Sequence, residues 1–261
     1  MKKINSFILL FVALCQLITV DANAQKEMPS LKNKKVLFVN GGWKGHEPTQ
    51  CRDIFVPWMR SEGAEVFVFD NLGCYNDSVL MSKVDLIVQT WTMGTIKNDE
   101  EKNLLKAIKR GVGIAGWHGG LGDSFRQNVE YQFMVGGQWV AHPGGKVPYR
   151  VNITNSKDYV TKGIKDFNMN TEQYYMHVDP NVKVMATTTF NGDHAAWIDG
   201  TVMPVIWKKY YGDGRVFYSS LGHIATDFDV PEVLEVMKRG IRWASESKYG
   251  KKEKWLSPVY K

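Results

Sequence analysis

Short apolar runs and segments with helical spacing alternate through the first half of the chain. The runs are continuous and rich in β-branched and aromatic residues, which is typical of parallel strands buried on both faces. They lie at residues 36–39, 66–69, 86–88 and 112–115. Residues 48–62 begin with a proline, and residues 99–110 open on acidic and close on basic side chains, as helices favour. The order of strand, helix and strand predicts a doubly wound α/β sheet.

The second half is less regular, but it predicts elements of the same kind. Residues 182–189, 202–210 and 216–219 are expected strands, and Gly212–Gly214 suits a hairpin turn. A last helix is expected over residues 231–245, where apolar residues recur at helical spacing. No internal repeat, low-complexity linker or break in composition marks a second domain. We therefore expect a single domain, a sandwich with a mostly parallel central sheet between helices.

The amino terminus has the three parts of a secretory signal. Lys2 and Lys3 precede an apolar run over residues 7–20, and the small residues that end at Ala24 form a cleavage site. The run is too short for a good membrane span, and no second such run follows, so no integral membrane segment is expected. Lipidation at Cys15 is the weaker alternative, because no small residue directly precedes this cysteine. The mature chain is expected to be secreted or periplasmic.

The formal net charge of +6 resides at the ends of the 261-residue chain. Residues 1–24 contribute +1, residues 25–35 contribute +3 and residues 248–261 contribute +4, which leaves residues 36–247 at −2. A body without a basic face argues against a nucleic-acid partner. The expected organisation is a signal peptide at 1–24, a basic segment at 25–34, one domain at 35–247 and a basic tail at 248–261.

Glycine-rich loops that carry tryptophan follow three of the expected strands. Trp43 and His46 follow the first strand, Trp91 follows the third, and Trp117 and His118 follow the fourth. The carboxyl ends of parallel strands meet at one edge of such a sheet, where ligands bind. This convergence is the strongest functional signal in the sequence.

The segment G-W-H-G-G at residues 116–120 has the spacing of a nucleophile elbow, a strained turn that holds one side chain above the sheet. Its centre is His118 rather than the Ser of hydrolases or the Cys of glutamine amidotransferases. An imidazole acts near neutral pH as a general acid, a general base or a metal ligand. His118 is therefore a candidate catalytic residue, and a cap on the following helix is the structural alternative.

Further motifs follow the elbow in order along the chain. They are G-G-Q-W-V-A-H-P at 136–143, E-Q-Y-Y at 172–175, and G-D-G-R-V-F-Y through L-G-H at 212–223. With the loop that bears His46, they resemble the ThuA-like family over about residues 35–244. This family, named for trehalose utilisation, is a branch of the class I glutamine amidotransferase-like superfamily. The resemblance implies a flavodoxin-like fold and a link to disaccharide and keto-sugar metabolism. Because no cysteine occupies the elbow, thiol-dependent glutaminase activity is excluded.

The same motifs supply further candidates. His223 follows an expected strand, and Glu172 precedes a pair of tyrosines. We expect both to act with His46 and His118. A sugar-binding set is also expected, because indole faces suit the apolar C–H faces of sugar rings and polar side chains suit their hydroxyls. Its members are Trp43, Trp91, Trp117, Trp139, His142 and Tyr174.

Several questions stay open at the level of sequence. Histidines and a carboxylate on one rim suit a divalent metal such as zinc, but no two of them show the short spacing of a metal motif, so no cofactor is certain. Cys51 and Cys74, the thiols that remain after signal removal, either pair or stay buried. His177 and His194 lie in less regular segments and are expected to be structural. The oligomeric state is not indicated.

The leading hypothesis is an exported enzyme of carbohydrate catabolism. As the resemblance implies, its substrate is a disaccharide or glycoside oxidised to a 3-keto sugar, whose ketone acidifies the adjacent C–H. His118 is expected to act as base or acid, assisted by His46 and His223 as proton-transfer partner or oxyanion stabiliser. Glu172 is the orienter or second acid–base group. The alternatives are a non-catalytic sugar-binding module and a metal-dependent hydrolase. In each case the expected partner is a small-molecule carbohydrate.

Overall fold

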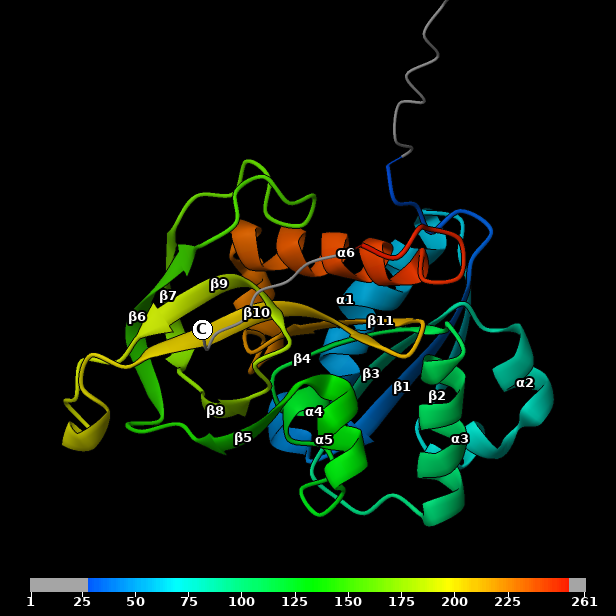
Figure 1. Ribbon diagram of the computed structural model, residues 1–261, viewed down its shortest axis with the longest axis horizontal. Helices are drawn as coiled ribbons and strands as arrows, with labels where there is room; N and C mark the ends of the chain where they lie inside the picture. Colours follow the sequence, from blue (N-terminus) through cyan, green and yellow to red (C-terminus); the bar gives the residue numbers. More distant parts are fainter. Residues whose placement is uncertain (1–27, 254–261) are drawn as a thin grey trace, which may run out of the picture.

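The computed structural model describes residues 28–253, which form three layers (Figure 1). The central layer is a sheet in the order β2-β1-β3-β4-β11-β10-β9-β6-β7. The first five strands are mutually parallel: β1 (Lys35–Gly42), β2 (Glu65–Phe69), β3 (Leu86–Thr92), β4 (Gly113–Trp117) and β11 (Gly214–Ser219). Each later strand pairs antiparallel with its neighbour: β10 (Val202–Tyr211), β9 (Lys183–Thr189), β6 (Lys146–Ile153) and β7 (Phe167–Glu172). A small antiparallel pair, β5 (Gly137–Ala141) and β8 (Tyr175–Val178), lies beside this sheet.

Two hydrophobic cores lie on opposite faces of the sheet, because successive side chains of a strand point in opposite directions. Leu37 and Val39 of β1 belong to one core, and Val36 and Phe38 belong to the other. The helices that supply residues to the first core are α2 (Ser78–Lys83), α3 (Asn98–Lys109), α4 (Gly119–Gly122) and α5 (Val129–Val135). The second core is covered by α1 (Pro48–Ser61) and α6 (Pro231–Ser245). Short 3₁₀ turns complete the chain at Lys44–His46, Leu72–Asn76, Ala196–Ile198 and Ala225–Asp229.

The predicted fold class is confirmed. The parallel strands follow the order 2-1-3-4-11, which is the flavodoxin-like order with β11 as the fifth strand. The expected helices at 48–62, 99–110 and 231–245 correspond to α1, α3 and α6. The turn expected at residues 212–214 joins β10 to β11, with Tyr211 paired to Gly214.

The strands between residues 137 and 178 were not predicted from the sequence. Strand β7 alternates buried Phe167, Met169 and Thr171 with exposed Asn168 and Asn170. Asparagine is depleted in strands, so its presence weakens the local β signal although the alternation is regular. These strands are stabilised by pairing rather than by their own propensity: β6 and β7 pair at the end of the large sheet, and β5 and β8 pair with each other beside it.

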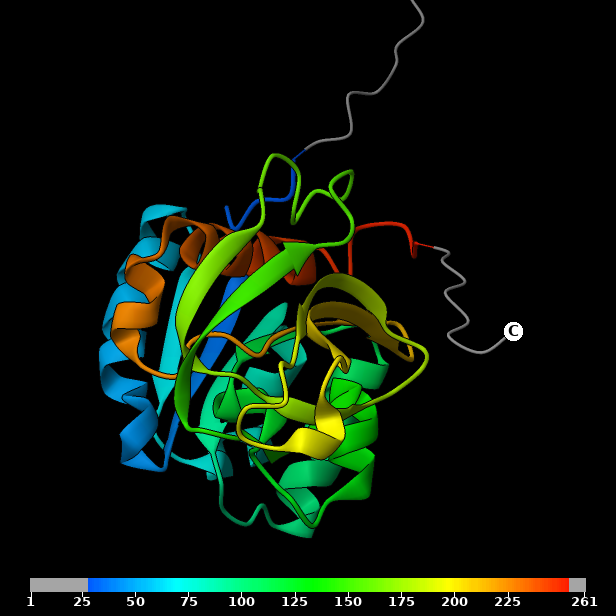
Figure 2. The same cartoon turned by 90° about the vertical axis from the view of Figure 1, so that its left-hand side faces the viewer.

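The antiparallel half curls over the carboxyl ends of the parallel strands, as the side view shows (Figure 2). Strand β7 is five positions from β4 in the sheet order. At about 4.8 Å per strand, a flat sheet would separate them by roughly 24 Å. Nevertheless, Glu172 at the end of β7 lies 3.0 Å from His118, directly after β4. The curl therefore brings two distant parts of the sheet to one place.

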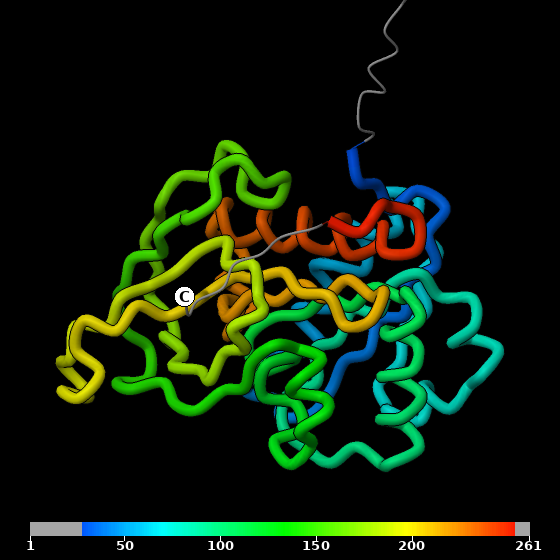
Figure 3. The backbone as a smooth tube through the Cα atoms, viewed as in Figure 1, coloured from blue at the N-terminus to red at the C-terminus, as the bar shows by residue number. Residues whose placement is uncertain are grey.

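The first and last described residues lie on the same side of the molecule (Figure 3). Lys248 Nζ donates to the Val84 carbonyl, just before β3, and Ser245 Oγ donates to the Ser30 carbonyl. These contacts lie at the amino ends of the parallel strands, away from the edge at which the candidate site was predicted. The expected signal peptide and Cys15 fall outside the described residues. Within residues 28–253, none of the helices has the length and apolarity needed to cross a bilayer.

Cys51 and Cys74 are both free and buried. They belong to different cores, so the sheet separates the two thiols. Burial raises the pKa of each thiol to about 12. The sequence left open whether these cysteines pair or stay buried, and in the structure they stay buried and unpaired.

Gly240→Ala tests how closely α6 packs on the sheet. A β-carbon at Gly240 would lie 2.0 Å from Cε1 of the buried Phe217 on β11. Overpacking costs about 1–3 kcal/mol, which should outweigh the gain of roughly 1 kcal/mol in helix propensity. We expect a lower free energy of unfolding in urea titrations. Lys102→Ala, at an exposed position of α3, should stay within about 0.5 kcal/mol of the wild type. Equal stability of all three proteins would contradict the packing.

Candidate functional site

The turn after β4 is the strained elbow that the spacing predicts. His118 has φ +47° and ψ −136°, and α4 begins at the next residue. Two glycines make room for the turn. A β-carbon at Gly116 would lie 2.5 Å from the Gln89 carbonyl oxygen, and one at Gly120 would lie 2.7 Å from Thr90 Cα. The turn thus requires glycine on both sides of His118.

Both ring nitrogens of His118 have partners. Nδ1 lies 2.7 Å from the Ser220 carbonyl oxygen, and Nε2 lies 3.0 Å from Glu172 Oε2. The ring stacks on Tyr174 at a centroid distance of 3.9 Å, and the Tyr218 hydroxyl donates to the His118 carbonyl at 3.0 Å. Since its side chain is only 1% exposed, His118 is held from several sides.

His223 completes a triangle with His118 and Glu172. Its Nδ1 lies 3.2 Å from Glu172 Oε2 and 3.3 Å from His118 Nε2. The Asp227 carboxylate accepts from the His223 amide at 2.9 Å and from the Thr171 hydroxyl at 2.8 Å. Asp227 thereby ties the loop after β11 to the end of β7.

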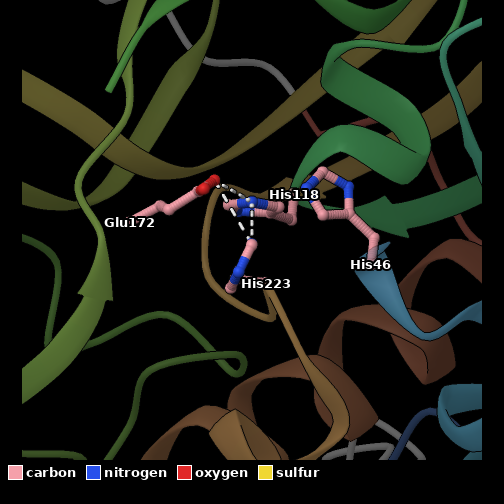
Figure 4. Close-up of side chains that lie close together, drawn as sticks. All are labelled: His46, His118, Glu172 and His223. Carbon is pink, nitrogen blue, oxygen red and sulfur yellow. Dashed lines mark hydrogen bonds and ion pairs between the residues drawn. The ribbon is translucent and has the colours of Figure 1, made fainter. Parts of the chain in front are cut away.

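His46 approaches this triangle from the loop after β1, as the close-up shows (Figure 4). Its ring lies 4.6 Å from that of His118 and 5.0 Å from that of His223. His46 Nδ1 lies 2.8 Å from the hydroxyl oxygen of Thr92, at the end of β3. One potential ligand atom from each of His46, His118, Glu172 and His223 lies within 4.8 Å of the others. We call these four residues the histidine–glutamate cluster; the predicted catalytic residues therefore meet.

Burial controls the protonation of this cluster. Burial and the neighbouring imidazoles of His118 and His223 lower the pKa of His46 to about 3. Burial also lowers the pKa of His118, although Glu172 opposes that shift. Burial by itself would raise the pKa of Glu172, but the contacts with His118 and His223 hold it well below its usual range. At neutral pH the lowered pKa values of His46 and His118 favour their neutral rings, and the lowered pKa of Glu172 favours its ionised carboxylate.

A cavity of about 200 Å³ opens beside the cluster. Arg126 forms a bidentate pair with Asp123 at 2.6 and 2.8 Å, and its guanidinium lies 4.5 Å from the centre of the Trp139 ring. Trp139 Nε1 and His142 Nδ1 are buried and have no hydrogen-bond partner in the described protein. The cavity is lined by Trp43, His46, Met93, Asp123, Arg126, Trp139, His142, Glu172 and Tyr174.

Two larger cavities, of about 390 and 490 Å³, contain no member of the cluster in their walls. The first lies against β6 and residues 189–195, and the second lies beside Asp158 and Lys208. We place the candidate site at the smaller cavity because titratable groups and aromatic rings converge there.

The structure separates the expected sugar-binding residues. Trp43, Trp139, His142 and Tyr174 line the cavity. Trp117 does not, because it is 2% exposed and packs in the second core against Phe55 and Phe228. Trp91 packs against the first core and is also absent from the cavity wall. His177 and His194, expected to be structural, are exposed and lie outside the cluster.

Sequence reasoning missed four residues that shape the site. Asp123 and Arg126 line the cavity, whereas Thr92 and Asp227 hold His46 and the His223 loop. Thr92 ends β3, in a segment that the sequence predicts to be a functional loop, but nothing distinguishes it from its neighbours there. The other three show no spacing that would have identified them.

Acidification should destabilise the fold through His46. Its pKa is 6.5 as a free side chain and about 3 in the fold, so between these values the unfolded chain binds a proton that the folded chain excludes. The free energy of unfolding should therefore fall as the pH drops from 6.5 towards 3. His46→Gln should reduce this slope by at most about 1.4 kcal/mol per pH unit. Urea titrations from pH 7 to 4, with a chelator present, measure this dependence of the free energy of unfolding on pH. The exposed His177→Gln is the control, and identical slopes in all three proteins would refute the expectation.

Two solved structures have a similar fold. A ThuA-like protein from Bacteroides uniformis ATCC 8492 is 16% identical with a TM-score of 0.70, and the match covers 82% of this chain and 91% of that one. A ThuA-like protein from Parabacteroides merdae ATCC 43184 is also 16% identical, with a TM-score of 0.66 and coverage of 85% and 93%. At this identity the likeness establishes the fold alone.

Sequence comparison gives the family. No curated protein matches the chain. The family model of ThuA, described as trehalose utilisation, matches residues 35–244. This range includes both glycines of the elbow and every member of the histidine–glutamate cluster. The protein therefore belongs to the ThuA family, which is linked in general terms to trehalose utilisation.

Proposed function

We propose that the protein is an exported enzyme of carbohydrate catabolism that cleaves a disaccharide or glycoside with a 3-keto ring. Family membership supports a role in sugar utilisation. One observation carries the proposal: His46 and Glu172 belong to the histidine–glutamate cluster and also line the cavity. A ring in the cavity would meet titratable groups and indole faces together, because Trp43 lies 4.8 Å from the His46 ring and Trp139 lies 5.7 Å from the His142 ring.

The size of the cavity favours one sugar ring. Its volume of about 200 Å³ is below the roughly 300–1,000 Å³ of sites that enclose drug-sized ligands. The second ring of a disaccharide would extend outward past Trp43, whose side chain is 48% exposed and offers a stacking face.

A ketone at C3 makes cleavage by proton transfer chemically accessible. A base removes the proton from C2, and the electrons of that C–H bond form an enolate with the C3 carbonyl. The enolate then expels the glycosidic oxygen from C1 while an acid protonates this oxygen. Water adds across the resulting C1–C2 double bond, returning a hydrogen to C2 and placing a hydroxyl on C1. The chemistry needs one group that cycles between base and acid.

We assign this cycling group to His142. Its side chain is 37% exposed and lines the cavity, and its Nε2 lies 3.8 Å from Glu172 Oε1. His118, the base expected from the sequence, is 1% exposed and has partners at both ring nitrogens. Its proposed role is to position Glu172 rather than to reach the sugar.

Substitution of His142 tests the proposed chemistry. With a chromogenic 3-keto-glucoside as substrate, His142→Gln should lower kcat by about 10²–10⁴-fold, the usual contribution of a general acid–base group. The parent glucoside without the ketone should not be cleaved, because its C2–H is not acidic. A substrate deuterated at C2 should react more slowly with the wild type. His177→Gln, at an exposed histidine outside the site, is the matched control.

Two outcomes would reject the proposed function. If the 3-keto-glucoside and the parent glucoside were cleaved at equal rates, the ketone would have no role in the reaction. Binding of the sugar in calorimetry without any product would instead indicate a sugar-binding module, the alternative that keeps the same cavity.

The two cavity tryptophans should determine substrate affinity. Trp139→Ala removes a ring that packs under Arg126 in the cavity wall, and we expect KM to rise about 5- to 10-fold, equivalent to roughly 1 kcal/mol of stacking. Trp197→Ala removes a tryptophan that is 87% exposed and outside this cavity, so KM should not change. Steady-state kinetics of both variants measures the difference, and equal KM values would rule out the stacking wall.

A further inference from the structure

The contact between His118 and Glu172 needs a positive charge. The Ser220 carbonyl can only accept a hydrogen bond, so the proton of a neutral His118 ring must be on Nδ1. His118 Nε2 then presents a lone pair to the Glu172 carboxylate at 3.0 Å. Two acceptors at this distance repel each other unless a proton or a cation lies between them.

The spacing of the donor atoms suits a cation. His118 Nε2, His223 Nδ1 and Glu172 Oε2 form a nearly equilateral triangle with sides of 3.0, 3.2 and 3.3 Å. Ligand bonds of about 2.0–2.1 Å in a tetrahedral site separate neighbouring ligand atoms by about 3.3 Å. The triangle therefore has the dimensions of one face of such a site, and His46 is the fourth member of the cluster.

We propose that His46, His118, Glu172 and His223 bind one divalent transition-metal ion, with zinc as the ion that the donor set suits best. Three imidazoles and one carboxylate are typical of zinc and other first-row metals, whereas magnesium and calcium prefer oxygen ligands. The four residues come from loops or strand ends more than 40 residues apart, which is why no short metal motif appears in the sequence.

Outer contacts of the imidazoles support this assignment. Metal-binding histidines usually donate the other ring N–H to an oxygen, which fixes the tautomer and the orientation of the ring. His118 does so with the Ser220 carbonyl, and His46 Nδ1 lies at hydrogen-bond distance from the Thr92 hydroxyl. An ion pair between a protonated His118 and Glu172 would by itself explain the 3.0 Å distance between these two side chains. It would not explain why His46 and His223 also converge on this pair.

Binding of the ion is inferred from the donor atoms alone. Only its chemical role rests on the proposed function. When bound beside the cavity, a divalent ion would polarise a sugar carbonyl and stabilise developing negative charge. The proposed enolate would otherwise form next to the Glu172 carboxylate, which lines the same cavity. The protein's own part is to hold the four donors, to orient them through Thr92 and Ser220, and to keep His142 free for proton transfer.

Metal content tests the proposal without any sugar. The full-length gene is expressed with a tag that contains no histidine, and the purified protein is analysed for metals after reconstitution with zinc and dialysis. We expect about one zinc ion per chain. His118→Ala and Glu172→Gln should lose most of it, and His177→Gln should retain it. Cobalt reconstitution should give visible absorption bands in the wild type that both cluster variants lack.

Thr92→Val provides a variant that keeps all four proposed ligands. Removing the hydroxyl beside His46 should weaken zinc affinity about 10- to 100-fold, as measured by competition with a chromogenic chelator. Circular dichroism and thermal unfolding verify that every variant folds. Negligible metal in the wild type after reconstitution would overturn the proposal, and so would full zinc content in folded His118→Ala and Glu172→Gln.

The outcome is separable from that of the proposed function. Metal-free protein that still cleaves the keto-glucoside would reject the ion and retain the function. Protein that binds one ion and leaves every keto-sugar unchanged would retain the ion and reject the function.

Discussion

The contact between His118 and Glu172 joins the two halves of the molecule. His118 belongs to the parallel half of the sheet, and Glu172 ends the strand at the far antiparallel edge. They meet because the antiparallel half curls over the carboxyl ends of the parallel strands (Figure 2). The cavity depends on the same curl, since Glu172, Tyr174 and His142 come from the curled half, whereas Trp43 and His46 come from the parallel half.

Several neighbouring groups hold the strained backbone of the elbow in place. The positive φ of His118 is unfavourable for a residue with a β-carbon, so the surrounding structure must hold it. The Tyr218 hydroxyl and the amide of Gly122 both donate to the His118 carbonyl, and the His118 amide donates to the Ser219 carbonyl. With the backbone held in this way and the ring held by Ser220, Glu172 and Tyr174, His118 loses little further entropy when it binds a partner, which is an advantage for a functional site.

The cluster is costly for the fold. Burial removes water from three imidazoles and a carboxylate, and such groups are retained only where they are paired. Elsewhere in the protein a buried charge is matched by opposite charges: the Asp158 carboxylate, for example, accepts from Lys208 at 2.6 Å and from Lys183 at 2.9 Å. In the cluster, by contrast, several acceptors share very few protons. That imbalance distinguishes a site that binds or transforms something from a structural ion pair.

Local pattern was sufficient for the parallel half of the protein. Continuous apolar runs predict buried parallel strands, and the rule that their carboxyl ends share an edge placed His46, His118 and His223 together. The glycine spacing likewise predicted the elbow. Pattern was insufficient for β5 to β8, because these strands are stabilised by pairing with other segments of the chain, and in β7 asparagines weaken the local β signal.

The sequence by itself determined the fold class, the elbow and the identity of the residues near the strand ends. Only the tertiary structure decided which of them face a common space. Trp117 and His118 are adjacent in the sequence, yet the indole lies in the second core while the imidazole joins the cluster. The position of Glu172 beside His118 depends on the curl of the sheet. This curl accumulates over many strands and is not specified by any local motif.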